Sequence, residues 1–390
     1  ATALNNLGEI HRDDGRFAEA EVMFKRALAI NERNLPADHP YLIATRANLA
    51  GLYLFASRPV EAEPLFRSAL TVLEKTLPAN NPQLGMANYW LARTLFEQKK
   101  YEEALPVAKR ASAIIGNSNS RAVTRQLRGG SLDESNYDQV FTLDARIAFA
   151  LSVGRPQDID MLRAGAFEVL QRADADDTGR SLANMASRFA AGSDDLARLL
   201  REQRDLLRHL PALDRRLANA LGSSDPAARA QAAALRTEAE AIGTRLKDID
   251  VTLRRDHPAY GDLADPKPIS VAETQSLLQP NEALALVLPV PEATFIFAVS
   301  STKIDWAVAP IRSEDLTERI ATLRRQLDPN LWRTRPLEPF DRALAHRLYR
   351  ALWAPLEDVL KDKSQVFVIT TGPLTSFPLS VLVTEAPKDG

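Results

Sequence analysis

The first third of the chain repeats itself every 42 residues, and this period constrains the fold more than any other feature. Adding 42 takes Ala20 to Ala62 and then to Ala104. The same shift joins Ala27 to Ala69 and Ala111, Phe24 to Phe66, Leu35-Pro36 to Leu77-Pro78, Pro40 to Pro82, and Pro64 to Pro106. Chance does not produce matches at so many positions, so the segment consists of three copies of one structural unit.

Each unit predicts two helices. Leu7 and Ile10 keep the spacing of an apolar helical stripe, and Gly15 then breaks the helix. A second stripe follows at Ala20, Phe24, Ala27 and Leu28. The small residues let the two helices approach closely, and the large ones fill the gap. Because one hairpin cannot bury its apolar face alone, the hairpins are expected to stack side by side.

The units resemble tetratricopeptide repeats, particularly the longer type found in kinesin light chains. In that type the second helix runs on to a Leu-Pro…Asp-His-Pro turn, which here spans Leu35 to Pro40. The resemblance covers residues 1–116, and the third unit departs from it with Ala108 where the others have phenylalanine. It implies an α-solenoid that binds other polypeptides.

The first helices of such an array are expected to line a concave groove. Seven side chains on that face are candidates for a peptide-binding site: Asn5, Asn6, Glu9, Asn48, Tyr89, Trp90 and Arg93. Asn6 and Asn48 occupy equivalent positions, and their amides suit the backbone of an extended peptide. The alternative is an ordinary solvated helix face. A protein or peptide partner is therefore predicted for this groove.

The middle of the chain predicts a linker followed by more helices. Residues 117–136 are rich in Ser, Asn, Gly and Arg and lack an apolar period, as linkers do. Residues 137–265 read as helical, with a divergent hairpin at 141–172 and a long coiled-coil arm. In that arm, apolar residues recur every seven positions on both sides of a Gly-Ser-Ser turn at 222–224, which predicts an antiparallel coiled-coil hairpin. Pro211 is expected to kink or interrupt its first helix.

After Pro258 the apolar period changes from helical to strand-like. Three short strands are expected at 283–290, 294–299 and 304–308, as a small antiparallel sheet. Two helices come next, and Val366 to Ile369 then reads as a buried-type strand that begins an α/β sheet. Because it is the only plausible strand of that sheet, the segment from Gln365 onward is expected to be exposed in this chain. The predicted fold class is thus mainly α: a solenoid and a helical hairpin, followed by an incomplete α/β domain over residues 266–390.

Several motifs in this last region look like the opening of a CHAT domain, a caspase-like domain found behind tetratricopeptide repeats. They are Leu278-Gln279-Pro280-Asn281-Glu282, Leu348-Tyr349, Pro355-Leu356, Gly372-Pro373-Leu374 and Phe377-Pro378-Leu379. The resemblance implies a cysteine endopeptidase that uses a His and a Cys from later strands of the sheet. Neither can be placed on this sequence, so the chain is expected to be a fragment that ends before them. The alternative is a non-catalytic scaffold with a degenerate caspase-like domain.

Other chemistry finds no support in the sequence. There is no cysteine, and there is no phosphate-binding loop, His-Glu-x-x-His or Gly-x-Ser-x-Gly motif, so no catalytic, metal or cofactor residue is assigned. His11 aligns with Tyr53 and is expected in the core. A net charge of -2 argues against nucleic acid as a partner, and the basic cluster around Trp332 reads as solvated. No apolar run reaches membrane-spanning length. The sequence opens without Met, which leaves the compartment open, with the cytoplasm favoured.

Overall fold

The computed structural model describes residues 1–116, 135–173, 194–223, 225–258, 260, 267–328 and 339–387. By their internal contacts, the residues form two units: Ala1–Leu151 with Ala175–Lys267, and Ser152–Asp174 with Pro268–Gly390. The segment Ser152–Asp174, which the sequence analysis grouped with the helical region, therefore belongs with the sheet. Most of the expected linker at 117–136, and Trp332 with its neighbouring arginines 333 and 335, lie outside the described residues.

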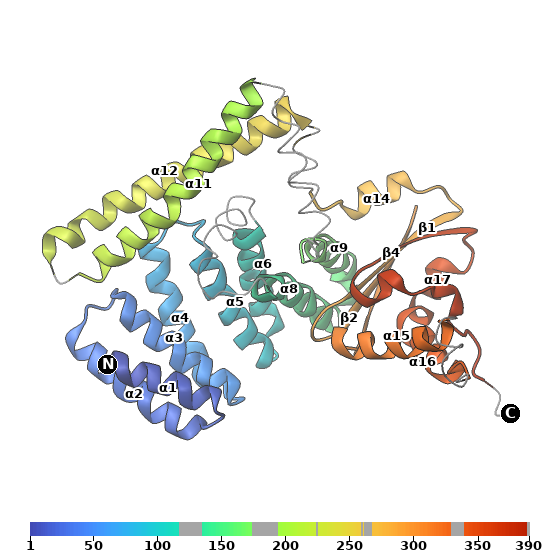
Figure 1. Cartoon of the computed structure of the whole chain (residues 1–390), viewed down its shortest axis with the longest axis horizontal. Helices are drawn as coiled ribbons and strands as arrows, with labels where there is room; N and C mark the ends of the chain where they lie inside the picture. The colour runs from blue at the N-terminus through green and yellow to red at the C-terminus, as the bar shows by residue number, and fades with distance from the viewer. Residues whose placement is uncertain are drawn as a thin grey trace. The chain divides into compact units, whose positions relative to one another are not determined.

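The repeat segment folds into three helical hairpins. Their helices are α1 (Thr2–Asp13), α2 (Phe17–Asn34), α3 (Pro40–Phe55), α4 (Pro59–Thr76), α5 (Pro82–Glu97) and α6 (Tyr101–Gly116). The second helices begin at 17, 59 and 101, which is the sequence period, and the hairpins lie side by side in Figure 1. The predicted helices and their stacking are confirmed.

Burial follows the same period. Ala20, Ala62 and Ala104 are each 0% exposed, because they lie where the two helices of a hairpin approach most closely. Phe24 and Phe66 fill the gap beside them, and Ala108 takes that position in the third hairpin. The second-helix stripe read from the sequence is therefore core, whereas Leu7 and Ile10 of the first-helix stripe are 41% and 56% exposed.

The turn inside each hairpin has one residue with left-handed backbone geometry. Gly15, Ser57 and Lys99 stand 42 residues apart and have φ values of 75°, 57° and 60°. In each turn the next residue donates its N–H to a backbone carbonyl of the preceding helix. In the first hairpin the Arg16 N–H donates to the His11 carbonyl at 2.8 Å. Glycine adopts this conformation freely, whereas serine and lysine are strained in it.

Ion pairs at equivalent positions join successive hairpins. Glu21 binds Arg58 at 2.6 Å, and Glu63 binds Lys100 at 2.8 Å. Arg58, with Lys25 and Tyr53, lowers the pKa of Glu21 to about 2. Burial raises the pKa of Glu63, but Lys100, Arg67 and Gln98 outweigh it and bring the value to about 2. Because folding lowers both pKa values, the two carboxylates stabilise the stacked array at pH values above the ordinary carboxyl pKa. This stabilisation is lost as the pH falls toward 2.

The described residues of this unit contain three more helices. α8 (Ser135–Gly154) follows the array, and Tyr89 donates to Gln139 of α8 at 3.0 Å. α11 (Asp194–Leu221) and α12 (Pro226–Asp256) pack as the predicted hairpin, with heptad residues such as Leu213, Leu246 and Ile249 buried between them. Pro211 lies within α11 and does not interrupt it, so of the two expected effects the interruption does not occur. A helix tolerates proline at the loss of one backbone hydrogen bond, and packing against α12 compensates for it here.

The second unit is built on a four-stranded sheet. Its strands are β1 (Glu282–Pro289), β2 (Thr294–Ser300), β3 (Ile304–Ala309) and β4 (Gln365–Thr370). The order is β3-β2-β1-β4, with antiparallel pairs except for β1 and β4, which are parallel. The expected antiparallel sheet and the expected later strand therefore share one mixed sheet.

Helices cover both faces of this sheet. α15 (Ser313–Leu327), α16 (Arg342–Leu352) and α17 (Glu357–Leu360) pack on the face that carries Ile296 and Ala298. On the opposite face Phe297 meets Phe167 of α9 (Ile159–Leu170), with ring centres 5.6 Å apart. Gln171 then exchanges two hydrogen bonds of 2.9 Å with the backbone of Ile269, ahead of α14 (Val271–Leu277). Short 3-10 turns lie at 156–158, 354–356, 372–376 and 379–381.

The outer strand β4 is the poorly covered part of this sheet. The structure pairs it with β1 on one side, and the described residues place no strand on its other side. Phe367, Val368 and Ile369 are 43%, 39% and 50% exposed. The sequence predicted an apolar strand of the buried type that would be exposed in this chain, and the structure shows such an exposed edge, with β1 paired on its other side.

Candidate functional site

On one face of the array, the first helix of each hairpin presents the residue at the same repeat position. Asn6 on α1, Asn48 on α3 and Trp90 on α5 are separated by the 42-residue period. Asn6 is exposed, whereas Asn48 and Trp90 are half-buried. We call this surface, together with Asn5, Glu9, Tyr89 and Arg93, the first-helix face.

A polar cluster joins α1 to α3 on this face. The side-chain amide of Asn48 donates to Asn5 Oδ1 at 3.1 Å and to Glu9 Oε1 at 2.7 Å. Asn5 donates to the same Glu9 oxygen at 2.9 Å. The Asn48 amide hydrogens are therefore used within the array. Its carbonyl oxygen and the second carboxylate oxygen of Glu9 are the groups best placed to accept hydrogen bonds from a peptide.

An aromatic cluster occupies the next part of the face. The Trp90 ring stacks on Phe66 at a centroid distance of 6.3 Å and meets the edge of Tyr89 at 5.2 Å. The guanidinium of Arg93 lies 5.5 Å from the Trp90 ring centre, which is a cation–π distance. Tyr89 itself is buried. This cluster offers an apolar plate and a cation on a half-buried surface.

The structure thus groups the seven predicted residues into two sets, with Asn6 exposed beside them. Asn5, Glu9 and Asn48 form the polar set, and Tyr89, Trp90 and Arg93 form the aromatic set. Sequence reasoning missed Phe66, whose stacking holds the Trp90 ring, and Gln139, which binds the Tyr89 hydroxyl. Phe66 was recognised only as a core residue of the repeat.

A second surface of the array, missed at the sequence level, is its row of turns between repeats. His39 and Asn81 are equivalent positions, and each accepts a hydrogen bond that caps the next helix, from Tyr41 N–H at 3.2 Å and from Gln83 N–H at 2.9 Å. Both side chains are buried. They begin α3 and α5 in the same way, which keeps the repeats in register.

The hairpin of α11 and α12 docks on these turns. Arg229 binds Asp38 at 2.6 Å, and the His39 ring contacts the Gly222 carbonyl at 3.0 Å. One repeat further on, Asn81 donates to Asp214 at 3.3 Å. Arg236 also donates to the backbone carbonyl of Lys75. The coiled-coil hairpin is therefore a brace across two successive turns of the array.

Gly243 marks the closest approach in this docking. A Cβ atom at this position would lie 2.5 Å from the side-chain nitrogen of Asn80. Glycine is unfavourable inside a helix, so its place in the middle of α12 is explained by this contact. Nearby, burial raises the pKa of Asp214. A lone glycine within an otherwise periodic helix was the available sequence signal for this interface.

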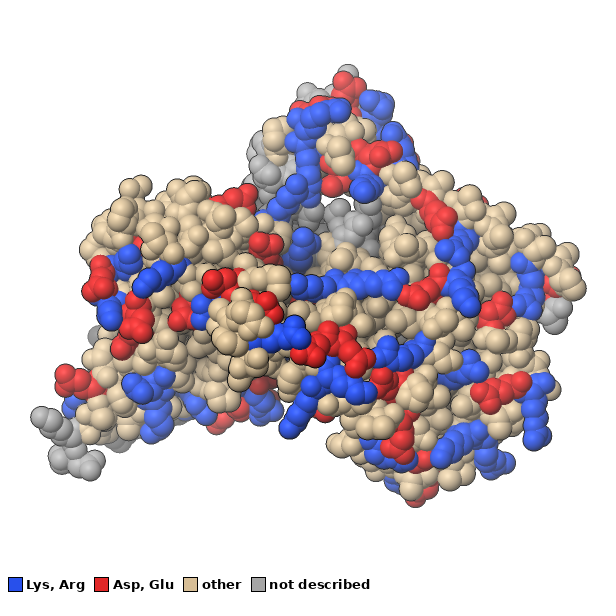
Figure 2. Space-filling view, turned by 180° about the vertical axis from the view of Figure 1, so that it is seen from behind, with Lys and Arg blue, Asp and Glu red and all other residues tan. Residues whose placement is uncertain are grey.

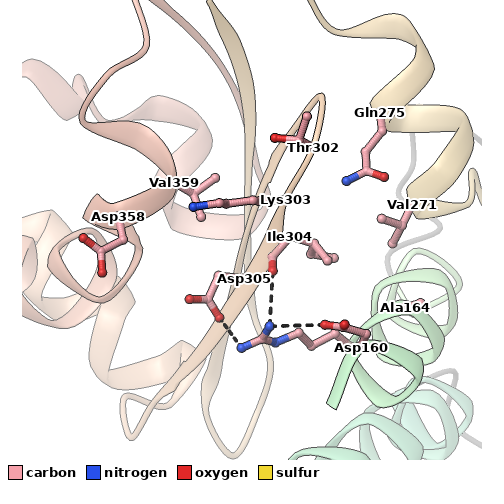
Figure 3. Close-up of a pocket in the computed structure, with 11 residues that line it drawn as sticks. Asp160, Ala164, Val271, Gln275, Thr302, Lys303, Ile304, Asp305, Asp358 and Val359 are labelled. Carbon is pink, nitrogen blue, oxygen red and sulfur yellow. Dashed lines mark hydrogen bonds and ion pairs between the residues drawn. The ribbon is translucent and has the colours of Figure 1, made fainter. Parts of the chain in front are cut away.

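The second unit contains a cavity of about 550 Å³, whose lining residues include Asp160, Arg163, Gln275, Lys303 and Asp305 (Figure 3). Arg163 spans its wall: it binds Asp305 at 2.6 Å and Asp160 at 3.6 Å, and it donates to the Ile304 carbonyl at 3.3 Å. Figure 3 shows Lys303 extending toward Asp358. Because Arg163 is engaged by β3, its main effect is to tether α9 to the sheet.

The histidines show no catalytic arrangement in the described part of the chain. The His346 ring contacts the Val383 carbonyl at 2.9 Å, and His209 contacts Glu238 at 3.2 Å. Within the same residues, no group of His, Cys, Asp and Glu is arranged to hold a metal ion. None of the helices placed by the structure combines the length and the apolarity needed to cross a bilayer.

Comparison with known proteins agrees with the repeats. A family model described as tetratricopeptide repeat matches residues 1–75. Two solved structures of kinesin light chain repeats from Podospora anserina, one of them a point variant, are 18% identical to this chain. The matches cover 65% of this chain and 96% of each of those chains, with TM-scores of 0.35 and 0.34. A search of curated protein sequences found no match. The N-terminal part of the chain is therefore an array of tetratricopeptide repeats, a protein-interaction scaffold.

Proposed function

We propose that the array recruits a protein partner by binding an extended peptide on its first-helix face. The observation that carries this proposal is that Asn6, Asn48 and Trp90 occupy equivalent positions in the three repeats. Stacked repeats place equivalent residues in a row, and a row of polar and aromatic groups suits a ligand that is itself extended.

The two clusters suggest how such a peptide would be held. The polar set offers Asn48 Oδ1 and the outer oxygen of Glu9 to backbone N–H groups, and exposed Asn6 adds an amide that can donate and accept. The aromatic set offers Trp90 to an apolar side chain and Arg93 to a carboxylate. The preferred ligand is therefore an extended segment with an apolar residue followed or preceded by an acidic one.

The test is to select binding peptides against the whole chain by display and to measure their affinity for variants. The combination Asn6→Ala, Asn48→Ala and Trp90→Ala should weaken binding by at least tenfold, since a few central contacts usually carry most of the affinity. Glu97→Ala, on an exposed position of α5, is the matched control. Asn48→Ala leaves the Asn5–Glu9 hydrogen bond in place, so the fold should persist. Equal affinities for all folded variants would remove this face from the account.

For the second unit we propose that residues 266–390 form the first part of a caspase-like CHAT domain, so that recruitment by the repeats regulates proteolysis. Supporting this are the motifs quoted above and the parallel pairing of β4 with β1. The exposed apolar residues of β4 also suit coverage by further polypeptide. A cysteine mechanism needs a thiolate, and this sequence contains no cysteine, so the nucleophile would have to come from outside it.

A non-catalytic scaffold is the competing proposal for this unit. The two are separated by a thiol-directed activity probe applied to the protein isolated from its natural source and to residues 1–390 alone. A regulated protease predicts labelling of the natural protein that is blocked by a competing peptide substrate, and none of the isolated chain. Absence of labelling in both would favour the scaffold.

A further inference from the structure

The two helices of the docked hairpin use their arginines differently. On α12 each arginine has a carboxylate partner: Arg229 with Asp38, Arg236 with Glu240, Arg245 with Glu202, Arg254 with Asp250, and Arg255 with Asp256. On α11, Arg198 binds Asp195 at 3.4 Å. Among the described residues, the five later arginines of α11 form no ion pair: Arg201, Arg204, Arg208, Arg215 and Arg216.

Four of these arginines lie in one line along α11. At about 100° per residue, Arg201, Arg204, Arg208 and Arg215 fall within about 60° of the helix circumference. Their span of fourteen residues corresponds to a rise of about 21 Å. All four are exposed, and the buried seam residues Leu213 and Leu217 lie on roughly the opposite side of the helix. We call this line the arginine stripe.

The nearby acidic groups do not neutralise the stripe. Glu202 is held by the guanidinium of Arg245 at 2.6 and 2.8 Å, and Asp214 is turned toward Asn81. His209, beside the stripe, contacts Glu238 of α12. Asp205 lies at the edge of the stripe, is exposed, and forms no ion pair among the described residues. The stripe therefore keeps an excess of positive charge.

This arrangement is unfavourable for the helix on its own. Arg201 and Arg204 are three residues apart, and Arg204 and Arg208 are four apart, so like charges face each other. Each such pair destabilises a helix by about 0.2–0.5 kcal/mol. The arginines of α12, and Arg198 of α11, instead pair with carboxylates. An external anionic partner would remove this cost from the stripe.

We propose that the arginine stripe is a docking surface for an acidic segment of a protein partner. Guanidinium groups bind carboxylates through two parallel hydrogen bonds, and four of them in line fit a helix that carries glutamates at matching intervals. A nucleic acid fits less well, because α11 has no Phe, Trp or Tyr for base stacking. Figure 2 shows basic and acidic side chains interspersed over one face of the molecule.

The test uses the whole chain and a labelled helical peptide with glutamates at intervals of three, four and seven residues and alanine elsewhere. Fluorescence anisotropy at low salt should show binding that weakens at least tenfold in the variant R201Q/R204Q/R208Q/R215Q. Replacing the same four arginines with lysine should weaken it by a smaller factor, because charge is kept and the bidentate geometry is lost. The same peptide with glutamine in place of glutamate should not bind.

The matched control is R319Q/R342Q/R347Q/R350Q, which removes the same formal charge from the second unit and should change the affinity less than twofold. Equal losses in the stripe variant and the control would overturn the proposal, since binding would then reflect net charge alone. A duplex DNA that binds the stripe more tightly than the acidic peptide would also overturn it, in favour of a nucleic-acid surface. Circular dichroism of each variant establishes that the hairpin remains folded.

Discussion

The repeat array and the mixed sheet bury their apolar residues by different rules. In the array, burial on the second helices recurs from unit to unit: Ala20, Ala62 and Ala104 are all fully buried. In the sheet, β2 is buried along its whole length, whereas β4, of similar composition, is exposed. Contacts in the array are between neighbours along the chain, and the contact that places β4 beside β1 joins residues about 83 apart.

The difference teaches where local sequence suffices. Because the same unit occurs three times, the helix boundaries and buried positions inferred for one copy can be compared with those of the other two within the sequence itself. The sequence of a strand shows only that the strand is apolar, because its place in the sheet depends on partner strands elsewhere in the chain.

The largest expected effect tests this contrast directly. Ala62→Arg places a long charged side chain between two helices and should destabilise the protein by about 4 kcal/mol, through overpacking and a buried charge. Val368→Arg on exposed β4 should change the free energy of unfolding by less than about 1 kcal/mol. Chemical denaturation measures both, with Glu97→Arg as the exposed control within the array. Similar costs for Ala62→Arg and Val368→Arg would break the comparison.

The next effect depends on pH. Asp144 of α8 is buried, and burial raises its pKa to about 6 from 3.8. The folded state therefore keeps a proton that the unfolded state releases, so stability falls as pH rises from about 4 to 6 and then stays level. Asp144→Asn removes this dependence. The variant should gain on the wild type by up to about 3 kcal/mol between pH 3.5 and pH 7. A constant difference across that range would show that Asp144 is not desolvated.

A smaller effect sharpens the comparison at the docked hairpin. Gly243→Ala should stabilise a free helix by about 1 kcal/mol, but here the methyl group would meet Asn80, so we expect a net loss of about 1 kcal/mol. In an Asn80→Ala background the sign should reverse. If Gly243→Ala stabilises both backgrounds equally, the hairpin does not dock on the turn as described.

The smallest effect concerns the hairpin turns. Lys99 has the left-handed geometry that Gly15 adopts in the first hairpin. Lys99→Gly should therefore stabilise the protein by about 0.5–1 kcal/mol, although glycine usually destabilises. Glu97→Gly, two residues earlier and helical, should instead cost about 1 kcal/mol. A loss of stability in both variants would show that the turn does not repeat the geometry of its equivalents.

Sequence reasoning located the array well because its signal is local and repeated. It placed the hairpins, their core alanines and the heptad positions of α11 and α12. It missed the docking of that hairpin on the turns at His39 and Asn81, since buried polar residues in turns look like ordinary loop residues. It also could not show that the Asn48 amide donates hydrogen bonds to Asn5 and Glu9, because these bonds depend on side-chain geometry across two helices.

The central claim is that the first-helix face of the array holds a peptide, and cross-linking tests it most directly. Because the chain has no cysteine, a single one can carry a photoreactive label at a chosen position. Labels at Asn6→Cys, on the first-helix face, and at Glu103→Cys, on exposed α6, should be compared using a peptide selected against the whole chain. The account predicts efficient cross-linking from position 6 and little from position 103, with competition by unlabelled peptide. Cross-linking from position 103 alone would contradict it.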